Sequence, residues 1–396
     1  MIPRSLRVAA SAASLLLMAG CAGNATNSSS GSGNTGPIVI GASMALSGQI
    51  NLASTLAGYQ MKINEINKAG GLDVGGAKRK IQLKVLDNRG DTSTMLQQVR
   101  TLVLNDGASA LLGSCCQENI DMEAQADALK VPLVEVDLPV ELLPAGKGYT
   151  WDAFQSLADA AHQVYQIAGT VSTNKKTLIV TDNDAQGIST AKLWTQLGQQ
   201  AGFTAASTKA VPTGTTDFSN VIASGKSSGA QILIASMTPP DCFAMWKQMK
   251  ALAYTPKLAI GLQCAQTPGW GSLGSVGNGA LVVVNWTKTA GLPYTARIIK
   301  EYGAKFPALT DLASVAGGYH AADILLAAIK QAGSDNPQAI NKAMATVRIT
   351  SALGPNSFKK NKSITPTYLG QWENGGIAQV WPTKGAVPLK PLSGLK

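Results

Sequence analysis

The chain has 396 residues, of which 45% are hydrophobic and only 14% are charged, and its formal net charge is +10. This length suffices for two domains, and the abundance of Gly with few charges is typical of a compact α/β protein. The lysines are scattered and the aromatic residues are few. No stretch alternates basic and stacking side chains, so we expect no nucleic-acid partner.

The N-terminus has the pattern of a bacterial lipoprotein signal. Arg4 and Arg7 precede an apolar stretch that ends at Met18-Ala19-Gly20-Cys21. We therefore predict a signal peptide over residues 1–20 and lipidation of Cys21. An ordinary secretory peptide cleaved nearby is the alternative. A spanning helix is disfavoured, because the run is shorter than the roughly 20 residues that cross a bilayer.

Residues 21–36 consist almost entirely of small polar residues, which is typical of a flexible linker. The signal and linker together predict an extracytoplasmic protein, anchored by lipid to the bacterial cell membrane. Its net positive charge suits a location near anionic lipid or cell wall. We expect no later segment that is long and apolar enough to cross a membrane.

The first half of the mature chain alternates strands and helices. Apolar runs and helical spacings predict strands over 38–42, 81–86, 108–112 and 131–136, and helices over 52–66, 91–103 and 119–129. The order β-α-β-α-β-α-β predicts a parallel sheet with helices on both faces.

The same alternation then starts again. The predicted strands are 176–181, 203–211, 231–236 and 257–261, and the helices between them are 188–201, 218–225 and 242–252. Helices over 295–305, 312–331 and 337–347 and strands near 367–371 and 377–380 follow. The fold class is thus α/β, with two doubly wound lobes. Ligands bind beyond the carboxyl ends of parallel strands, so the expected site is the cleft between lobes.

The reactive residues do not indicate an enzyme. Cys115 and Cys116 have no histidine nearby in sequence, so packing or ligand contact is more probable than catalysis. His162 and His320 have no metal-ligand spacing, and we expect no metal and no cofactor. Cys242 and Cys264 follow adjacent predicted strands, which leaves open a disulfide or two buried thiols.

Short sequence motifs follow one another along the chain: Ile38-Val-Ile-Gly with Leu46-Ser47-Gly48, Ile63-Asn-Glu-Ile-Asn-Lys-Ala-Gly-Gly71, Asp87-Asn-Arg-Gly-Asp91, Asn105-Asp-Gly107, Gly214-Thr-Thr-Asp-Phe-Ser219, Gly318-Tyr-His-Ala-Ala-Asp323 and Gly354-Pro355. This ordered series resembles the branched-chain amino-acid-binding protein family, the extracytoplasmic receptors of ABC importers. The likeness covers roughly residues 37–382, and it rests on the order of the motifs rather than on any one of them.

The resemblance implies the type I periplasmic-binding-protein fold, with two lobes joined by a hinge of three crossings. Those crossings are expected near Trp151–Phe154, Asn285–Lys288 and Arg348–Ala352. Lobe 1 would comprise residues 37–150 and 289–347, and lobe 2 residues 151–288 and 348–396.

The resemblance also places the ligand contacts, and this chain departs from the family at them. The loop that binds a ligand carboxylate falls on Cys116 and Gln117, and the next loop on Asp137-Leu138-Pro139. Gln186 occupies the position of the aromatic residue that covers the ligand in the family. Gln263 occupies the position of the acidic residue that binds the ligand's amino group. Ser47 and Thr238 lie in loops that follow predicted strands, where ligand contacts are also expected. Trp151, Phe154 and Trp286 lie at the crossings, where they either stack on a ligand or pack the hinge.

A neutral Gln263 cannot neutralise a buried ammonium, although Asp137 could do so from the other lobe. We therefore expect that leucine, isoleucine and valine are not the preferred solutes. The predicted function is capture of a small polar solute for an ABC permease, by a monomer that is not an enzyme. The alternative is a receptor of the same fold that reports to a signalling partner.

Overall fold

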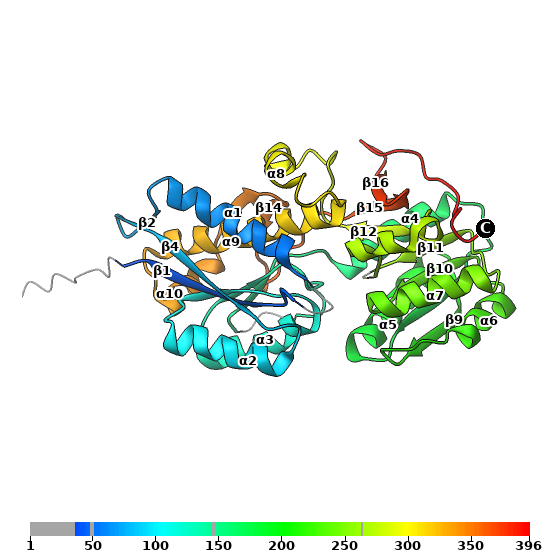
Figure 1. Cartoon of the computed structure of the whole chain (residues 1–396), viewed down its shortest axis with the longest axis horizontal. Helices are drawn as coiled ribbons and strands as arrows, with labels where there is room; N and C mark the ends of the chain where they lie inside the picture. Colours follow the sequence, from blue (N-terminus) through cyan, green and yellow to red (C-terminus); the bar gives the residue numbers. More distant parts are fainter. Residues whose placement is uncertain (1–35, 48–50, 144–147, 263) are drawn as a thin grey trace, which may run out of the picture. The chain divides into compact units, whose positions relative to one another are not determined.

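The computed structural model describes residues 36–47, 51–143, 148–262 and 264–396 (Figure 1). The predicted signal peptide, Cys21 and the linker up to residue 35 lie outside the described residues. Gly36 to Lys396 belong to one compact unit. Within it the strands form two large sheets, each at the centre of one lobe.

The first lobe contains a five-stranded parallel sheet in the order β4-β1-β5-β6-β7. Its strands are β1 (Ile38–Met44), β4 (Ile81–Asp87), β5 (Ala110–Leu112), β6 (Leu133–Glu135) and β7 (Thr150–Asp152). The hairpin β2 (Leu72–Val74) and β3 (Ala77–Arg79) and the short β7 were not predicted. Each of these three strands contains a charged residue and no apolar run, whereas apolar runs mark the equally short β5 and β6.

Helices cover both faces of this sheet (Figure 1). One face carries α1 (Ala53–Lys68), α9 (Leu309–Ala332) and α10 (Pro337–Met344), and the other α2 (Thr92–Arg100), η1 (Thr101–Asn105) and α3 (Cys116–Leu129). The predicted start of α2 is confirmed, because the Asp91 carboxylate accepts a hydrogen bond from the Thr94 N–H at 2.7 Å. Helix α8 (Thr295–Tyr302) contacts α9.

Helices α1 and α9 cross where Gly58 of α1 lies against Gly318 of α9. A Cβ atom at Gly58 would lie 2.2 Å from the Val315 carbonyl oxygen, and one at Gly318 would lie 2.1 Å from the Thr55 carbonyl oxygen. Only glycine permits such close backbone approach. Helix α9 is also long and apolar enough to span a membrane, contrary to expectation, but 83% of its most apolar window is buried inside the protein. It is the core helix of this lobe.

The second lobe contains a seven-stranded sheet in the order β16-β15-β12-β11-β10-β8-β9. Strands β8 (Lys176–Asp182), β9 (Thr204–Val211), β10 (Ile232–Ser236), β11 (Leu258–Gly261) and β12 (Leu281–Val284) are parallel, and β15 (Tyr368–Glu373) and β16 (Gly376–Trp381) are antiparallel additions. The two faces carry α4 (Leu157–Gly169) with α5 (Ala185–Gln200), and α6 (Ser219–Ser228) with α7 (Pro239–Ala251), η2 (Cys264–Gln266) and η3 (Pro268–Gly277).

A disulfide ties two segments of the second lobe together. The Sγ atoms of Cys242, in α7, and Cys264, just after β11, lie 2.05 Å apart, with Cα atoms 6.0 Å apart. Strands β10 and β11 are hydrogen-bonded neighbours, so the segments that follow them are brought close together. Of the two states that the sequence left open, the structure contains the bonded one.

The segment expected to begin lobe 2 at residue 348 contacts the first lobe instead. The hairpin β13 (Arg348–Ser351) and β14 (Gly354–Ser357) packs on α9, and Phe358 packs edge-on against Trp151, with ring centroids 5.1 Å apart. Thr365 N–H then donates to the Phe154 carbonyl at 2.9 Å. We therefore propose that the third crossing lies at 363–367 rather than at Arg348–Ala352, and that residues 348–362 belong to lobe 1.

Candidate functional site

The candidate site lies at the carboxyl ends of the parallel strands in each lobe. The chain leaves β7 after Asp152 on its way to α4, and it leaves β12 after Val284 on its way to α8. Both crossings therefore start at a carboxyl edge. Loops at such edges are where open α/β sheets bind ligands.

In the first lobe, α1 places two hydroxyl groups at this edge. Thr55 Oγ1 donates to Asp137 Oδ2 at 3.4 Å, and Tyr59 Oη donates to the Gly113 carbonyl at 3.0 Å. Asp137 follows β6 and is half-buried. Burial raises the pKa of Asp137 to about 6, and the hydrogen bond from Thr55 opposes that shift. Burial first and Asp137 second raise the pKa of Tyr59 well above its usual range, so this phenol remains a hydrogen-bond donor.

Two further carboxyl groups lie at the same edge. Glu118, in the first turn of α3, accepts hydrogen bonds from the Ser114 hydroxyl and from Asn88 Nδ2, the latter at 3.2 Å. Glu118 Oε1 is buried and has no hydrogen-bond partner. Asp311, in the first turn of α9, is hydrogen-bonded to Ser54 and half-buried, and burial raises its pKa.

Behind this edge lies a pair of fully buried carboxyl groups. Glu135 and Asp152 are register partners on β6 and β7, so their side chains project from the same face. Both are 0% exposed, and none of their four carboxyl oxygens has a hydrogen-bond partner. Burial and mutual repulsion raise the pKa of Glu135 well above its usual range. Burial, against the opposing charge of Lys362, does the same for Asp152.

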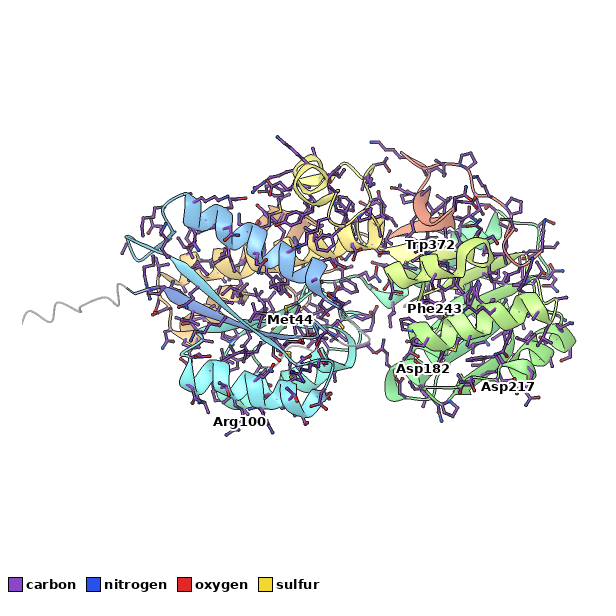
Figure 2. All side chains as sticks on the ribbon, in the orientation of Figure 1. Met44, Arg100, Asp182, Asp217, Phe243 and Trp372 are labelled. Atoms are coloured by element: carbon purple, nitrogen blue, oxygen red, sulfur yellow. A yellow bond between two sulfur atoms is a disulfide. The ribbon has the colours of Figure 1, made fainter. Side chains whose placement is uncertain are left out.

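In the second lobe, the corresponding edge is centred on Asp182 at the end of β8 (Figure 2). Its Oδ2 accepts the Thr238 N–H at 2.8 Å, whereas Oδ1 is buried without a partner. Burial first, and then the nearby Asp241 and Asp184, raise the pKa of Asp182 to about 6. Asp241 in turn accepts the Gly214 N–H at 2.8 Å. The acids therefore hold the loops after β8, β9 and β10 together.

The predicted contact residues fall in different surroundings. Ser47 is exposed and donates to Asp87 Oδ2 at 2.6 Å, and Thr238 and Gln186 are half-buried at the edge of lobe 2. Leu138 is fully buried. Gln263 lies outside the described residues, and the structure does not describe the side chains of Cys116 and Gln117. Backbone geometry places the latter two at the start of α3. All of them stay predictions as ligand contacts.

The crossing aromatics are packed inside the protein. Trp151 is 5% exposed, and its indole N–H donates to Asn341 Oδ1 at 2.7 Å. Phe154 is 9% exposed and Trp286 is fully buried. These surroundings favour packing of the hinge, which was one of the two roles considered for them.

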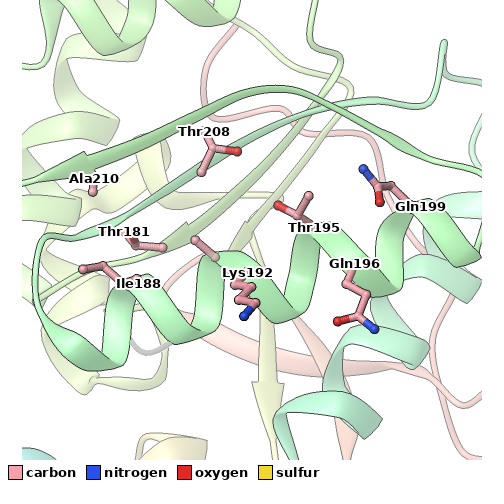
Figure 3. A pocket seen from close by; sticks show the side chains of 9 residues that line it. Thr181, Ile188, Lys192, Thr195, Gln196, Gln199, Thr208 and Ala210 are labelled. Carbon is pink, nitrogen blue, oxygen red and sulfur yellow. The ribbon is translucent and has the colours of Figure 1, made fainter.

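A groove of about 490 Å³ opens between α5 and the edge strand β9, on the flank of lobe 2 (Figure 3). Thr195 and Gln199 lie on the side of α5 that faces Thr208, whereas Lys192 and Gln196 point away from it. Apart from Thr181, the polar groups that line it come from a helix face and an edge strand rather than from loops at the strand ends. We therefore do not assign the ligand to this groove.

Sequence reasoning missed several polar residues of this edge. Thr55, Tyr59 and Asp311 lie on helices, and the hydrophobic period of α1 indicates packing only. Asp182 falls between the predicted strand 176–181 and the predicted helix 188–201, where no motif marks it. The spacing of Thr55 and Tyr59 in the sequence could have identified these two residues. Thr55 and Tyr59 are four residues apart, so both lie on one face, near the N-terminus that follows β1.

The architecture described so far, with two doubly wound sheets in tandem and chain crossings at their carboxyl edges, defines a two-lobe binding protein. Comparison with known sequences gives the family. The sequence pattern of the periplasmic binding protein family matches residues 37–377, and the chain belongs to that family. Its members are extracytoplasmic solute-binding proteins rather than enzymes. Among the described residues, no group of three or more His, Cys, Asp or Glu side chains could hold a metal ion.

Relatives and solved structures agree with this assignment. A Leu/Ile/Val-binding protein homolog 7 of Brucella abortus is 22% identical over 353 residues, which covers 83% of this chain and 87% of that protein. LivJ of Streptococcus pneumoniae in complex with isoleucine has a TM-score of 0.71 at 20% identity, covering 87% of this chain and 99% of that one. A solute-binding protein of R. palustris in complex with benzoate has a TM-score of 0.73 at 16% identity, covering 89% and 98%. These structural likenesses establish the fold.

Proposed function

We propose that this protein is a lipid-anchored extracytoplasmic receptor that captures a small polar solute between its two lobes and delivers it to an ABC permease. The observation that carries the proposal is the family match together with the polar side chains at both carboxyl edges, Thr55 and Asp137 in one lobe and Asp182 in the other. Closure about the crossings would let one solute bridge both edges and stabilise the closed state.

The relatives named for leucine, isoleucine and valine do not extend that preference to this chain. Gln263 stands where the resemblance places the acid that receives an amino group. We expect leucine, isoleucine and valine at millimolar concentration to give little heat in calorimetry. Tight binding of any of them would assign the acid's role to Asp137 or to another group.

The binding site is tested by solution scattering and affinity, after a thermal-shift screen has identified a solute. The solute should reduce the radius of gyration, and Gln117→Ala and Gln263→Ala should each weaken binding by about 1–3 kcal/mol, because a buried polar partner is left unpaired. Gln199→Ala, in the groove of Figure 3, is the matched control. A larger loss in the control, or no compaction on binding, would place the site elsewhere.

The anchor is tested separately. Cys21→Ser should leave the protein unlipidated and absent from the mature membrane fraction, while the purified variant binds the solute normally. Mass spectrometry that shows an unmodified Cys21 in the wild-type protein would contradict the anchor and leave solute binding intact.

A further inference from the structure

The polar groups at both carboxyl edges are predominantly carboxyl groups whose neighbours do not neutralise them. In the first lobe these are Glu118, Asp137 and Asp311, and in the second lobe Asp182. Glu118 and Asp182 are 8% and 5% exposed, and each keeps one buried carboxyl oxygen without a hydrogen-bond partner. Asp137 and Asp311 are half-buried and are bonded to the hydroxyl groups of Thr55 and Ser54. Such partners orient a carboxylate without cancelling its charge.

The basic side chains that the structure describes form no salt bridge with these acids, although the chain as a whole carries a net charge of +10. Arg89 and Lys288, which follow β4 and β12, are both exposed. The buried Lys62 and Arg79 are paired elsewhere, with Asp323 at 3.0 Å and Asp335 at 2.8 Å. In the part of the chain that the structure describes, no salt bridge joins a lysine or arginine to the four edge acids.

This arrangement disfavours a ligand of the kind present in the related complexes. Isoleucine and benzoate both carry a carboxylate, and a site for a carboxylate needs donors or positive charge. Here the first turn of α3, whose N–H groups would attract an anion, already contains Glu118. A second carboxylate beside Glu118 and Asp137 would meet like charge in a partly desolvated setting, which is unfavourable.

We propose that the solute is a small organic cation without a carboxylate, whose amine or guanidinium N–H groups are held by Asp137 and Asp311 from one lobe and by Asp182 from the other. The inference rests on the proposed function and names the chemical class of its ligand. Glu118 contributes negative potential from the first turn of α3. Each N–H to carboxylate bond is charge-assisted, and the solute neutralises acids that the protein leaves without a counter-ion.

A purely structural role for the same acids makes a different prediction. Asp311 and Glu118 lie in first turns, where an acid stabilises the helix dipole whatever the ligand is. If that were their whole function, removing the acids would lower stability without changing which solute charge is preferred. The preference for charge is therefore the measurement that separates the two roles.

The experiment uses the full mature chain and solutes that differ in charge. Thermal shift and calorimetry compare leucine with 3-methylbutylamine, 4-hydroxybenzoate with 4-hydroxybenzylamine, and 1,4-diaminobutane with neutral amides and sugars. We expect the amine in each of the first two pairs to bind at least tenfold more tightly than its carboxylate counterpart, and 1,4-diaminobutane to bind more tightly than the neutral solutes. The affinity of the amines should fall as salt is raised. Carboxylates or neutral solutes that bind more tightly than the amines overturn the inference and leave the proposed function standing.

Three variants test whether the edge acids cause the preference for a cation. Asp137→Asn and Asp182→Asn should each weaken binding of the best cation about tenfold, because a charge-assisted bond is lost while the acceptor oxygen that orders the loop remains. Asp73→Asn, an exposed acid in the β2–β3 hairpin, removes the same charge away from the edge and should leave affinity unchanged. Equal affinities in all three variants would overturn the inference. If no solute of any charge stabilises or compacts the wild-type protein, the proposed function itself fails.

Discussion

The two lobes share one architecture but are stabilised by different interactions. The first lobe relies on the glycine crossing of α1 and α9, and it contains ionisable groups at 0% exposure, namely Glu135, Asp152 and His320. The second lobe packs Trp246 against Trp270, with ring centroids 4.8 Å apart, and is cross-linked by a disulfide. The first lobe should therefore be the more sensitive to pH, and the second should respond to reduction, although their sheets are wound alike.

The largest effect is expected at the helix crossing of the first lobe. Gly318→Val should destabilise the protein by about 3 kcal/mol or more, because the new Cβ would meet the Thr55 carbonyl oxygen at 2.1 Å and neither backbone can move aside. Denaturant unfolding measures the loss. Gly169→Ala, in α4 of the second lobe, has no atom within 4 Å of its new Cβ and is the control. A loss of less than about 1 kcal/mol in Gly318→Val would show that the crossing is loosely packed.

Reduction of the disulfide should destabilise the second lobe. The Cys242–Cys264 disulfide closes a loop of 22 residues, and its loss should cost about 3 kcal/mol, mainly by freeing the unfolded chain. Hydrogen exchange should show faster opening of α7 and β11 and unchanged exchange in α1 and α9. The double variant Cys242→Ala/Cys264→Ala should no longer respond to reductant. Equal loosening of both lobes would contradict the division between them.

The buried carboxyl pair should make the first lobe less stable as pH rises. The folded pKa of Asp152 is raised, so the folded state retains a proton that the unfolded state loses near pH 4. Stability is then complete below the unfolded pKa and declines as pH rises toward the folded one, by at most about 3 kcal/mol per group between pH 5 and pH 7.

Asp152→Asn should reduce that decline, and so should Glu135→Gln, because each removes one of the two buried acids and leaves the other, as measured by denaturant unfolding at pH 5 and pH 7. Any fixed cost of the amide is the same at both pH values and cancels in the comparison. Asp91→Asn, at an exposed helix cap, should leave the pH dependence in this window unchanged. A wild-type protein whose stability does not fall between the two pH values, relative to Asp152→Asn, would show that Asp152 is ionised when folded.

His320 should have a smaller effect of the opposite sign. Burial lowers its pKa to about 3, and its Nδ1 accepts the Leu353 N–H at 3.4 Å. Between pH 3 and pH 6.5 the unfolded state binds the proton, so stability is complete above pH 6.5 and is lost as pH falls. Between pH 6.5 and pH 5.5 the loss should be about 1 kcal/mol. His320→Asn should remove this slope, and the exposed His162→Asn should not.

The fold class and most long elements of this protein follow from its amino-acid sequence alone. The apolar period suffices for α1 and the Asp91 cap for α2, whereas α9 is marked by a long apolar stretch that is buried on nearly all sides. The family resemblance is likewise confirmed. The lipid anchor remains a prediction, since Cys21 lies outside the described residues.

Which side chains meet follows only from the folded structure. The Cys242–Cys264 bond and the Glu135–Asp152 pair depend on strand order and register, which no local period encodes. The same holds for the contact of β13 with α9, which supports the position that we propose for the third crossing. The partners of Asp137 and Asp182 come from α1 and from the loop after β10, 82 and 56 residues away. Charge and burial at the two edges therefore emerge only when those segments are folded against each other.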